Sequence, residues 1–341
     1  MIDFLVSIID WLNDNFFAYY AISLVVFSVL FRLLVLPLDV KSRKGMRKMT
    51  KIQPMLTEIQ KKYANDQVKL QKKQQELMQK EHYNPLSGCL PMLLQYPILL
   101  IMFYAMRSVA NREMARQVLE AISGVENPIR PADTLLWIRN IWAPDSFFST
   151  IAPDLNQLRM IPKESWMKAV ELLSQEDLAR VLTALNVTEL DFANNLTALL
   201  TPINSAYSAS VFYRTMGANC LLTQTWIGNL YWPCNGYMIL AVLSLATQLI
   251  MTKVNPTSQE VQANDSNANQ QGQGMTKFMK YFFPIFSFYC CVSSYAAFAL
   301  YWVTSNVLMI GMTFGINKYL DMKEAREDAN KNPLKVEGTI R

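Results

Sequence analysis

Residues 17–38 read FAYYAISLVVFSVLFRLLVLPL, an almost entirely apolar stretch that is long enough to cross a bilayer and contains one charge, Arg32. An arginine at the centre of a membrane helix costs about 2.5–3.5 kcal/mol on insertion scales, so it usually faces a polar cavity, a partner charge or the membrane interface. Arg32 therefore either lines a cavity or extends to the cytoplasmic headgroups, since it lies only about 7 Å of helix rise before Pro37. Asp39 lies about 10 Å beyond Arg32 along the helix, too far for a pair within one helix.

The composition predicts an all-α polytopic membrane protein. Of the 341 residues, 51% are hydrophobic and 17% are charged, and the apolar residues form blocks instead of recurring at helical period. We expect five transmembrane helices, at residues 17–38, 86–106, 236–252, 276–292 and 295–318. The third and fourth are short against the roughly 20 residues that a hydrocarbon core requires, so they either extend into flanking aromatic residues or lie where the bilayer is thin.

The basic residues predict the orientation of these helices. Residues 39–85 contain many more lysines and arginines than acids, whereas the chain before the first span contains only the charges of Asp3, Asp10 and Asp14. The positive-inside rule therefore places residues 39–85 and the tail, 319–341, in the cytoplasm and the N-terminus outside. We expect residues 1–16 to form an amphipathic segment on the outer surface, with no removable secretion signal before the first span. The formal net charge of +5 is thus a sign of topology, and we do not infer nucleic-acid binding from it.

Three segments connect the spans. Residues 39–85 carry apolar residues at steps of three and four on both sides of a polar Asn65-Asp66 break, which predicts a cytoplasmic helical hairpin whose first arm bends or restarts at Pro54. Residues 107–235 form an enlarged extracellular loop or cap, in which the capping-box-like run SQED at 174–177 predicts short amphipathic helices. Residues 253–275 form a cytoplasmic loop. The basic hairpin is most simply a solvated surface, although it also suits contact with anionic lipid or ribosomal RNA.

The residues needed for most enzyme chemistry are missing from the sequence. His82 is the only histidine, so one chain cannot form a two-histidine zinc site or a histidine-based triad. The sequence also contains no glycine-rich phosphate loop and no Cys-x-x-Cys pair. We therefore expect no enzyme activity, no cofactor, no metal and no small-molecule substrate.

Several motifs in one order resemble the YidC/Oxa family of membrane protein insertases, and specifically its bacterial YidC branch. They are FRLLVLPLDVKS at 31–42, IQP at 52–54, EIQKKY at 58–63, KEHYNPLSGCLPMLLQYPI at 80–98, LWI at 136–138, APD at 143–145 and FALYWVTSN at 298–306. The resemblance covers most of the chain except about residues 146–231. Near the turn between the fourth and fifth spans, the family's Pro-Gly-like sequence is replaced by CCVSSY at 290–295.

The resemblance implies a five-span protein of the bacterial cell membrane that moves client transmembrane segments from the cytoplasm into the bilayer without nucleotide hydrolysis. The clients are nascent membrane proteins, and the Sec translocon, the ribosome and membrane lipids are candidate partners. Arg32 falls on the family's groove arginine, Gln95 on a polar position of span two, and Tyr301 and Asn306 on positions of span five that face the client path. The resemblance therefore implies a hydrophilic, client-binding groove formed by these four residues.

Two alternatives from other classes stay open. The polar residues of the spans would also suit a small-solute transporter, although the spans show no internal repeat, and a factor dedicated to one membrane complex is hardly distinguishable from an insertase by sequence.

The sequence also leaves one possible disulfide bond undecided. Cys220 and Cys234 both lie on the predicted outer side and are spaced to close a loop, so they form either a disulfide or two reduced thiols.

Overall fold

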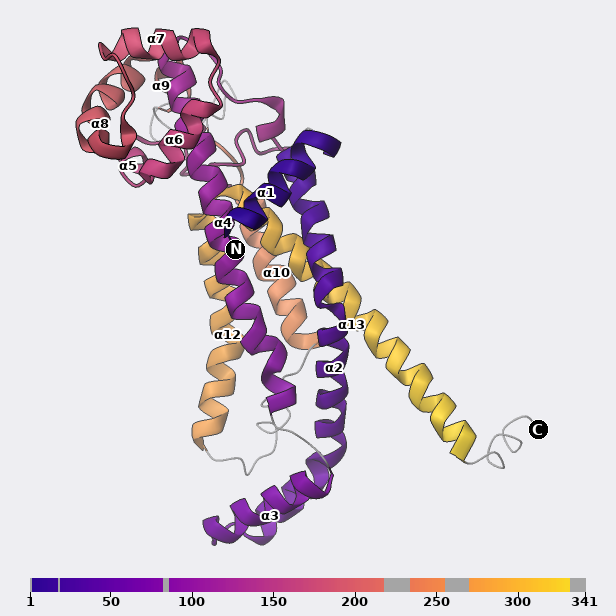
Figure 1. Ribbon diagram of the computed structural model, residues 1–341. Coiled ribbons are helices and arrows are strands. Elements are labelled where there is room, and N and C mark those ends of the chain that lie inside the picture. Colours follow the sequence, from indigo (N-terminus) through magenta and orange to yellow (C-terminus); the bar gives the residue numbers. More distant parts are fainter. Residues whose placement is uncertain (1, 18, 82–85, 218–233, 255–269, 332–341) are drawn as a thin grey trace, which may run out of the picture. The chain divides into compact units, whose positions relative to one another are not determined.

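The computed structural model describes residues 2–17, 19–81, 86–217, 234–254 and 270–331, and these residues are mostly helical (Figure 1). Within them, β-structure is limited to two isolated bridges, between Leu135 and Ile138 and between Thr150 and Cys234. The helical fold class predicted from the sequence is therefore observed.

Five helices overlap the predicted spans. They are α2 (Tyr20–Lys62), α4 (Leu86–Ile122), α10 (Ile239–Val254), α12 (Gln270–Ser293) and α13 (Ala296–Lys331). By length and composition, α2 and the 296–326 part of α13 are apolar enough to cross a membrane, while α10 and the 281–293 part of α12 are shorter apolar helices. Most of these helices extend well beyond the predicted ends of the spans.

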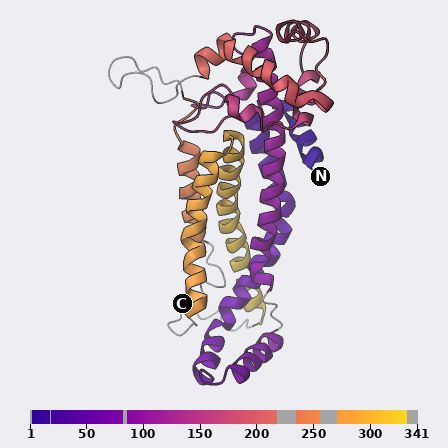
Figure 2. The same ribbon diagram turned by 90° about the vertical axis from the view of Figure 1, so that its left-hand side faces the viewer.

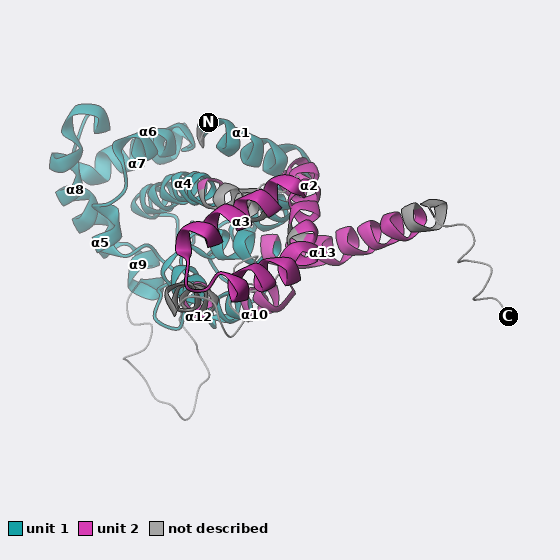
Figure 3. Ribbon diagram, turned by 90° about the horizontal axis from the view of Figure 1, so that it is seen from below, with its two compact units in different colours: residues 1–28, 99–245, 286–304 teal, residues 29–98, 246–285, 305–341 magenta. Residues whose placement is uncertain are grey.

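The chain divides into two compact units, which Figure 3 distinguishes by colour. The first unit comprises Met1–Ser28, Leu99–Leu245 and Phe286–Thr304, and the second comprises Val29–Ile98, Ala246–Ile285 and Ser305–Arg341. Each boundary falls inside one of the five long helices. The first unit contains the N-terminal part of α2, the C-terminal part of α4, the N-terminal part of α10, the C-terminal part of α12 and the N-terminal part of α13. Successive helices thus contribute opposite ends to the same unit.

Short helices form most of the first unit outside the long ones. They are α1 (Ile2–Leu12), the π-helix η1 (Asn13–Phe17), the 3-10 helix η2 (Pro131–Asp133), α5 (Leu155–Leu158), α6 (Lys163–Glu171), α7 (Gln175–Leu185), α8 (Phe192–Ala209) and α9 (Val211–Met216). Helix α8 packs against α5, α6, α7 and α9, and Figures 1 and 2 show these helices gathered together. Buried Trp166 stacks on Phe192 with ring centroids 5.3 Å apart. Because these helices share an apolar core, residues 155–216 are a folded cap.

The start of α7 shows why the cap sequence forms short helices. Ser174 is the N-cap, and its hydroxyl accepts a hydrogen bond from the Asp177 backbone N–H at 3.0 Å. The same hydroxyl lies 2.6 Å from a carboxylate oxygen of Asp177, to which it donates. Asn186 ends the helix in the left-handed conformation, with φ 53°. The SQED run therefore marks the helix start that its capping pattern predicts.

The second unit contains the two arms expected of the hairpin. The first arm is the C-terminal part of α2, the second is α3 (Gln67–Lys80), and Asp66 caps α3. Ile52 and Leu56 are buried, and Leu77 and Met78 pack against them. Helix α2 continues through Pro54 to Lys62, so the predicted restart at this proline does not occur. Packing of the adjacent apolar residues offsets the one helical hydrogen bond that Pro54 removes.

Candidate functional site

In the middle of helix α2, three charged side chains are buried and two leucines are exposed. Arg32, Asp39 and Arg43 are 7%, 6% and 8% exposed, whereas Leu33 and Leu34 are 56% and 75% exposed. A helix at the surface of a water-soluble protein shows the reverse pattern, because exposing apolar side chains to water and burying charges are both unfavourable. This arrangement indicates that lipid surrounds the helix and that the interior beside it is polar.

The buried charges of α2 lie along one face. Steps of seven and four residues separate Arg32, Asp39 and Arg43, and half-buried Arg47 follows four residues later; such steps return to nearly the same side of an α-helix. Arg32 is electrostatically coupled to Asp39, but within the described part of the chain its guanidinium makes no hydrogen bond and no ion pair within 4.0 Å. Arg32 is thus a buried cation whose hydrogen-bonding capacity is not used by the described residues.

Polar residues of α10 and α13 belong to the same unit as this face. The Asn306 side-chain amide donates to the Thr247 hydroxyl at 3.2 Å, and both residues are buried. Ser305 is 3% exposed, and its hydroxyl has no hydrogen-bond partner among the described residues. The interior of the second unit therefore contains buried hydroxyls, an amide and charges, where an ordinary core would be apolar.

Helices α2 and α13 run in the same direction where they meet. The Arg43 guanidinium donates to the Thr313 hydroxyl, and the following contacts advance along both helices together. Arg47 donates to the Asn317 carbonyl and pairs with Asp321, each at 2.8 Å, and Lys51 pairs with Glu324 at 3.3 Å. These contacts make α2 and α13 parallel over this stretch.

The other residues implied by the family resemblance are placed as follows. Tyr301 is 3% exposed and lies on α13 in the first unit, whereas Arg32 and Asn306 lie in the second. Gln95 lies on α4, but its side chain is outside the described part of the structure.

The described cysteines differ in their bonding state. Cys234 is disulfide-bonded, and Cys220 lies outside the described residues, so its pairing with Cys234 stays a prediction. Among the described residues, Cys290 and Cys291 are free thiols, and Cys291 is buried.

The first unit contains a buried ion-pair network that sequence reasoning missed. Arg116 is fully buried and contacts Glu113 at 2.7 Å, Glu120 at 2.5 Å and Asp133 at 2.8 Å. Burial alone would lower the pKa of Arg116. The surrounding carboxylates raise it by more than burial lowers it, so its pKa lies above the ordinary value. Burial likewise raises the pKa of Asp133 against the opposing charge of Arg116. The signal in the sequence is the spacing of 113, 116 and 120, which places all three charges on one face of α4.

A second carboxylate, Asp145, caps α10 from a distant part of the chain. It is fully buried and accepts hydrogen bonds from the backbone N–H groups of Tyr237, Met238 and Leu240 at 2.9, 3.2 and 2.8 Å. A Cβ atom at Gly236 would lie 2.0 Å from an Asp145 oxygen, so glycine is required there. This contact fixes the start of α10 against the segment that follows α4.

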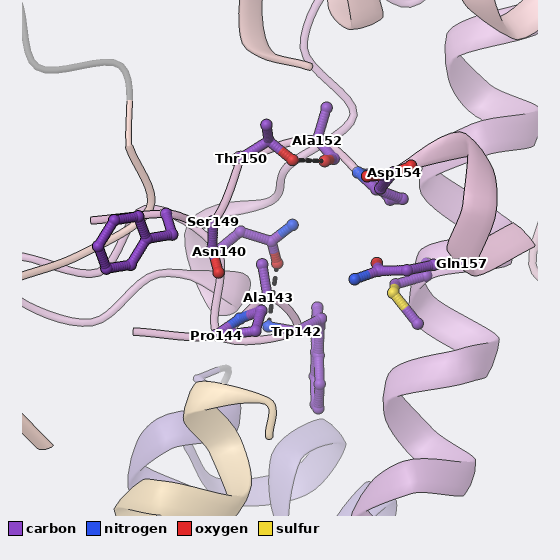
Figure 4. A pocket seen from close by; sticks show the side chains of 12 residues that line it. Asn140, Trp142, Ala143, Pro144, Ser149, Thr150, Ala152, Asp154 and Gln157 are labelled. Carbon is purple, nitrogen blue, oxygen red and sulfur yellow. Dashed lines mark hydrogen bonds between the residues drawn. The ribbon is translucent and has the colours of Figure 1, made fainter. Parts of the chain in front are cut away.

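The first unit also contains a small pocket of about 90 Å³ between the loop that follows α4 and helix α5 (Figure 4). Asn140 and Gln157 line it, and Figure 4 shows the Gln157 amide pointing toward Asn140. Asn140 is already hydrogen-bonded to Gln117, to the Ile151 carbonyl and to the Trp142 backbone. The pocket is well below the ~300 Å³ of typical ligand sites, so the polar interior of the second unit is the better candidate site.

Buried charges beside exposed leucines, on long and largely apolar helices, define a helical membrane protein with a polar interior. The chain belongs to the family of the 60Kd inner membrane protein, whose model matches residues 11–324.

Similar curated proteins carry the name membrane protein insertase YidC. The chain is 35% identical to the one from Clostridium perfringens over 129 residues, which cover 38% of this chain and 47% of that protein. It is 32% identical to the one from Clostridium tetani over 149 residues, 44% of this chain and 58% of that protein. It is 37% identical to the one from Fusobacterium nucleatum over 145 residues, 42% of this chain and 60% of that protein. The matches thus span about half the length of these relatives.

Proposed function

We propose that this protein is a bacterial membrane protein insertase, which moves client transmembrane segments from the cytoplasm into the bilayer without nucleotide hydrolysis. The observation that carries the proposal is the inward-facing, buried Arg32, whose guanidinium is unpaired among the described residues. A charge in this position is costly, and it is useful if it meets a passing group of opposite sign. Family membership and the names of the similar proteins support the same function.

In the proposed mechanism, the polar interior acts as a hydrophilic groove. Arg32 offers charge-assisted hydrogen bonds to an acidic client segment, while the client's apolar helix enters lipid directly. We place Gln95, Tyr301 and Asn306 along the client path. The short apolar helices α10 and α12 would thin the bilayer locally and shorten the distance over which client polar groups lack water.

The proposed topology has five spans, with the N-terminus and cap outside and the hairpin and C-terminal tail in the cytoplasm. The alternating helix ends within each unit and the parallel contacts of α2 and α13 support this number of spans. The basic excess of residues 39–85 supports the orientation. Nascent membrane proteins are the proposed clients, and the Sec translocon and the ribosome are proposed partners.

Substitution of Arg32 tests the proposed mechanism. Arg32→Ala should slow insertion of a client with an acidic external tail by about tenfold or more, since a hydrogen bond to a charged group contributes about 1.5–3 kcal/mol. Arg32→Lys should keep much of the activity, and a client with a neutral tail should tolerate both changes. Lys44→Ala is the matched control, because it removes a positive charge from an exposed position of the same helix. Wild-type insertion of the acidic-tailed client by Arg32→Ala would refute the role of Arg32.

A second experiment separates a general insertase from a factor dedicated to one membrane complex. The protein is depleted in its source cell and the membrane proteome is quantified. Loss of many small or single-span proteins is the result expected of an insertase, whereas loss of one complex alone would indicate a dedicated factor.

A further inference from the structure

Asp39 is the second buried charge on the inward face of α2, and its environment differs from that of an ordinary buried acid. It is 6% exposed, and one oxygen of its carboxylate is buried without a hydrogen-bond partner among the described residues. Buried carboxylates in proteins are normally paired or accept several hydrogen bonds, because an unsatisfied one loses its hydration without compensation. The described side chains therefore leave part of the hydrogen-bonding capacity of Asp39 unused.

The neighbouring arginines do not supply that partner. Asp39 is electrostatically coupled to Arg32 and Arg43, but it forms an ion pair within 4.0 Å with neither. Seven residues, or about 10 Å of helix rise, separate it from Arg32. Arg43 is committed to the Thr313 hydroxyl of α13. Asp39 and Arg32 are thus two separate charges of opposite sign on one buried face.

Their order along α2 matches the charge pattern of a typical membrane helix. Arg32 lies within the apolar stretch, and Asp39 lies at its end, next to the basic segment that we place in the cytoplasm. Membrane proteins carry lysine and arginine beside the cytoplasmic ends of their helices. Once the acidic tail has passed Arg32 and the client's apolar helix of about 20 residues spans the bilayer, its basic flank lies at the cytoplasmic end of that helix, at the level of Asp39.

On this basis, which rests on the proposed insertase function, we propose that Asp39 is a specificity-determining residue that binds the basic flank of the client segment. The carboxylate holds the lysines or arginines that remain in the cytoplasm, while Arg32 guides the acidic tail outward. The groove is therefore bipolar, and it selects clients by the charges on both sides of their apolar helix.

The test compares two clients that differ only in the cytoplasmic flank of one apolar helix, where one carries three lysines and the other three glutamines. Insertion rates are measured in liposomes of neutral lipid that contain the full-length protein, so that lipid charge does not select the clients. Wild type should insert the lysine client about tenfold faster than the glutamine client, the size expected from one hydrogen bond to a charged group. Asp39→Asn, which keeps the shape of the side chain, should bring the ratio of the two rates close to unity, and Asp39→Glu should restore much of it.

Two control variants test whether a change in the ratio of the two insertion rates is specific to Asp39. Glu58→Gln removes the same charge from an exposed position of α2 and should leave the ratio at the wild-type value. Arg32→Ala should slow acidic-tailed clients and leave the ratio unchanged. If Asp39→Asn slows both clients equally, Asp39 is only a counter-charge for Arg32 and Arg43, and the proposal is overturned. If wild type inserts neither client faster than empty liposomes, the proposed function itself fails.

Discussion

Arg116→Ala should destabilise the first unit by about 3–5 kcal/mol, the cost measured when one partner of a buried ion pair is removed. The structure shows which carboxylate would bear this cost. Glu113 keeps the guanidinium of Arg112 at 3.1 Å, and Glu120 keeps Arg130 at 2.9 Å. Among the described residues, Asp133 has no second cation and keeps only hydrogen bonds from Trp142 Nε1 and the Arg130 backbone N–H. The unpaired charge therefore falls on Asp133.

Thermal unfolding in detergent, followed by tryptophan fluorescence, measures this effect, because buried Trp142 donates directly to Asp133. Arg180→Ala is the matched control: its ion pair with Glu176 lies on the surface of α7 and should contribute less than about 1 kcal/mol. Asp133→Asn in the Arg116→Ala background should recover part of the lost stability, since it removes the unpaired charge. The reasoning is wrong if Arg116→Ala costs no more than Arg180→Ala, or if Asp133→Asn recovers nothing.

Two further predictions concern helix starts. Gly236→Ala should lower the free energy of unfolding by about 1–3 kcal/mol, because the new methyl group overlaps an oxygen of the Asp145 cap. Gly311→Ala is the control, since open space surrounds it, and it should change stability little. Equal unfolding temperatures of the two variants would contradict this prediction. Hydrogen bonding from Ser174 lowers the pKa of Asp177 in the folded protein below its ordinary value of 3.8. The ionised carboxylate therefore contributes stability above pH 3.8, and this contribution is lost as the pH falls through the lower pKa of the folded protein. Ser174→Ala should cost about 1 kcal/mol at neutral pH and weaken this acid dependence, and an unchanged pH profile would count against it.

The sequence predicted the helical class, the positions of the apolar helices and the SQED helix start, because each depends on local periodicity or capping. Arg32 was recognisable as a candidate because a charge inside an apolar stretch is rare. Its burial could not be derived, since snorkelling to the headgroups is consistent with the same sequence. Asp39 was set aside for its distance from Arg32 within one helix, and its importance becomes visible only when its side chain is found buried and unpaired.

The remaining differences come from tertiary contacts. The second span was predicted to end at residue 106, and helix α4 continues beyond it to Ile122. Its charges are satisfied by one another and by Asp133, a partner that no local pattern identifies. Similarly, Asp145 caps α10 across more than ninety positions of sequence, as its bond to Leu240 N shows. Such contacts depend on how segments far apart in the sequence pack together, so local sequence patterns do not predict them.

The most direct test of the proposed function is insertion by the purified protein alone. Full-length protein is reconstituted into liposomes, a single-span client with an acidic tail is added without nucleotide, and protease protection of the tail measures its transfer. We predict transfer well above that of empty liposomes, with a clear loss in Arg32→Ala and much of the activity kept in Arg32→Lys. Transfer no greater than in empty liposomes, from a protein shown to be folded by its unfolding transition, would contradict the proposal.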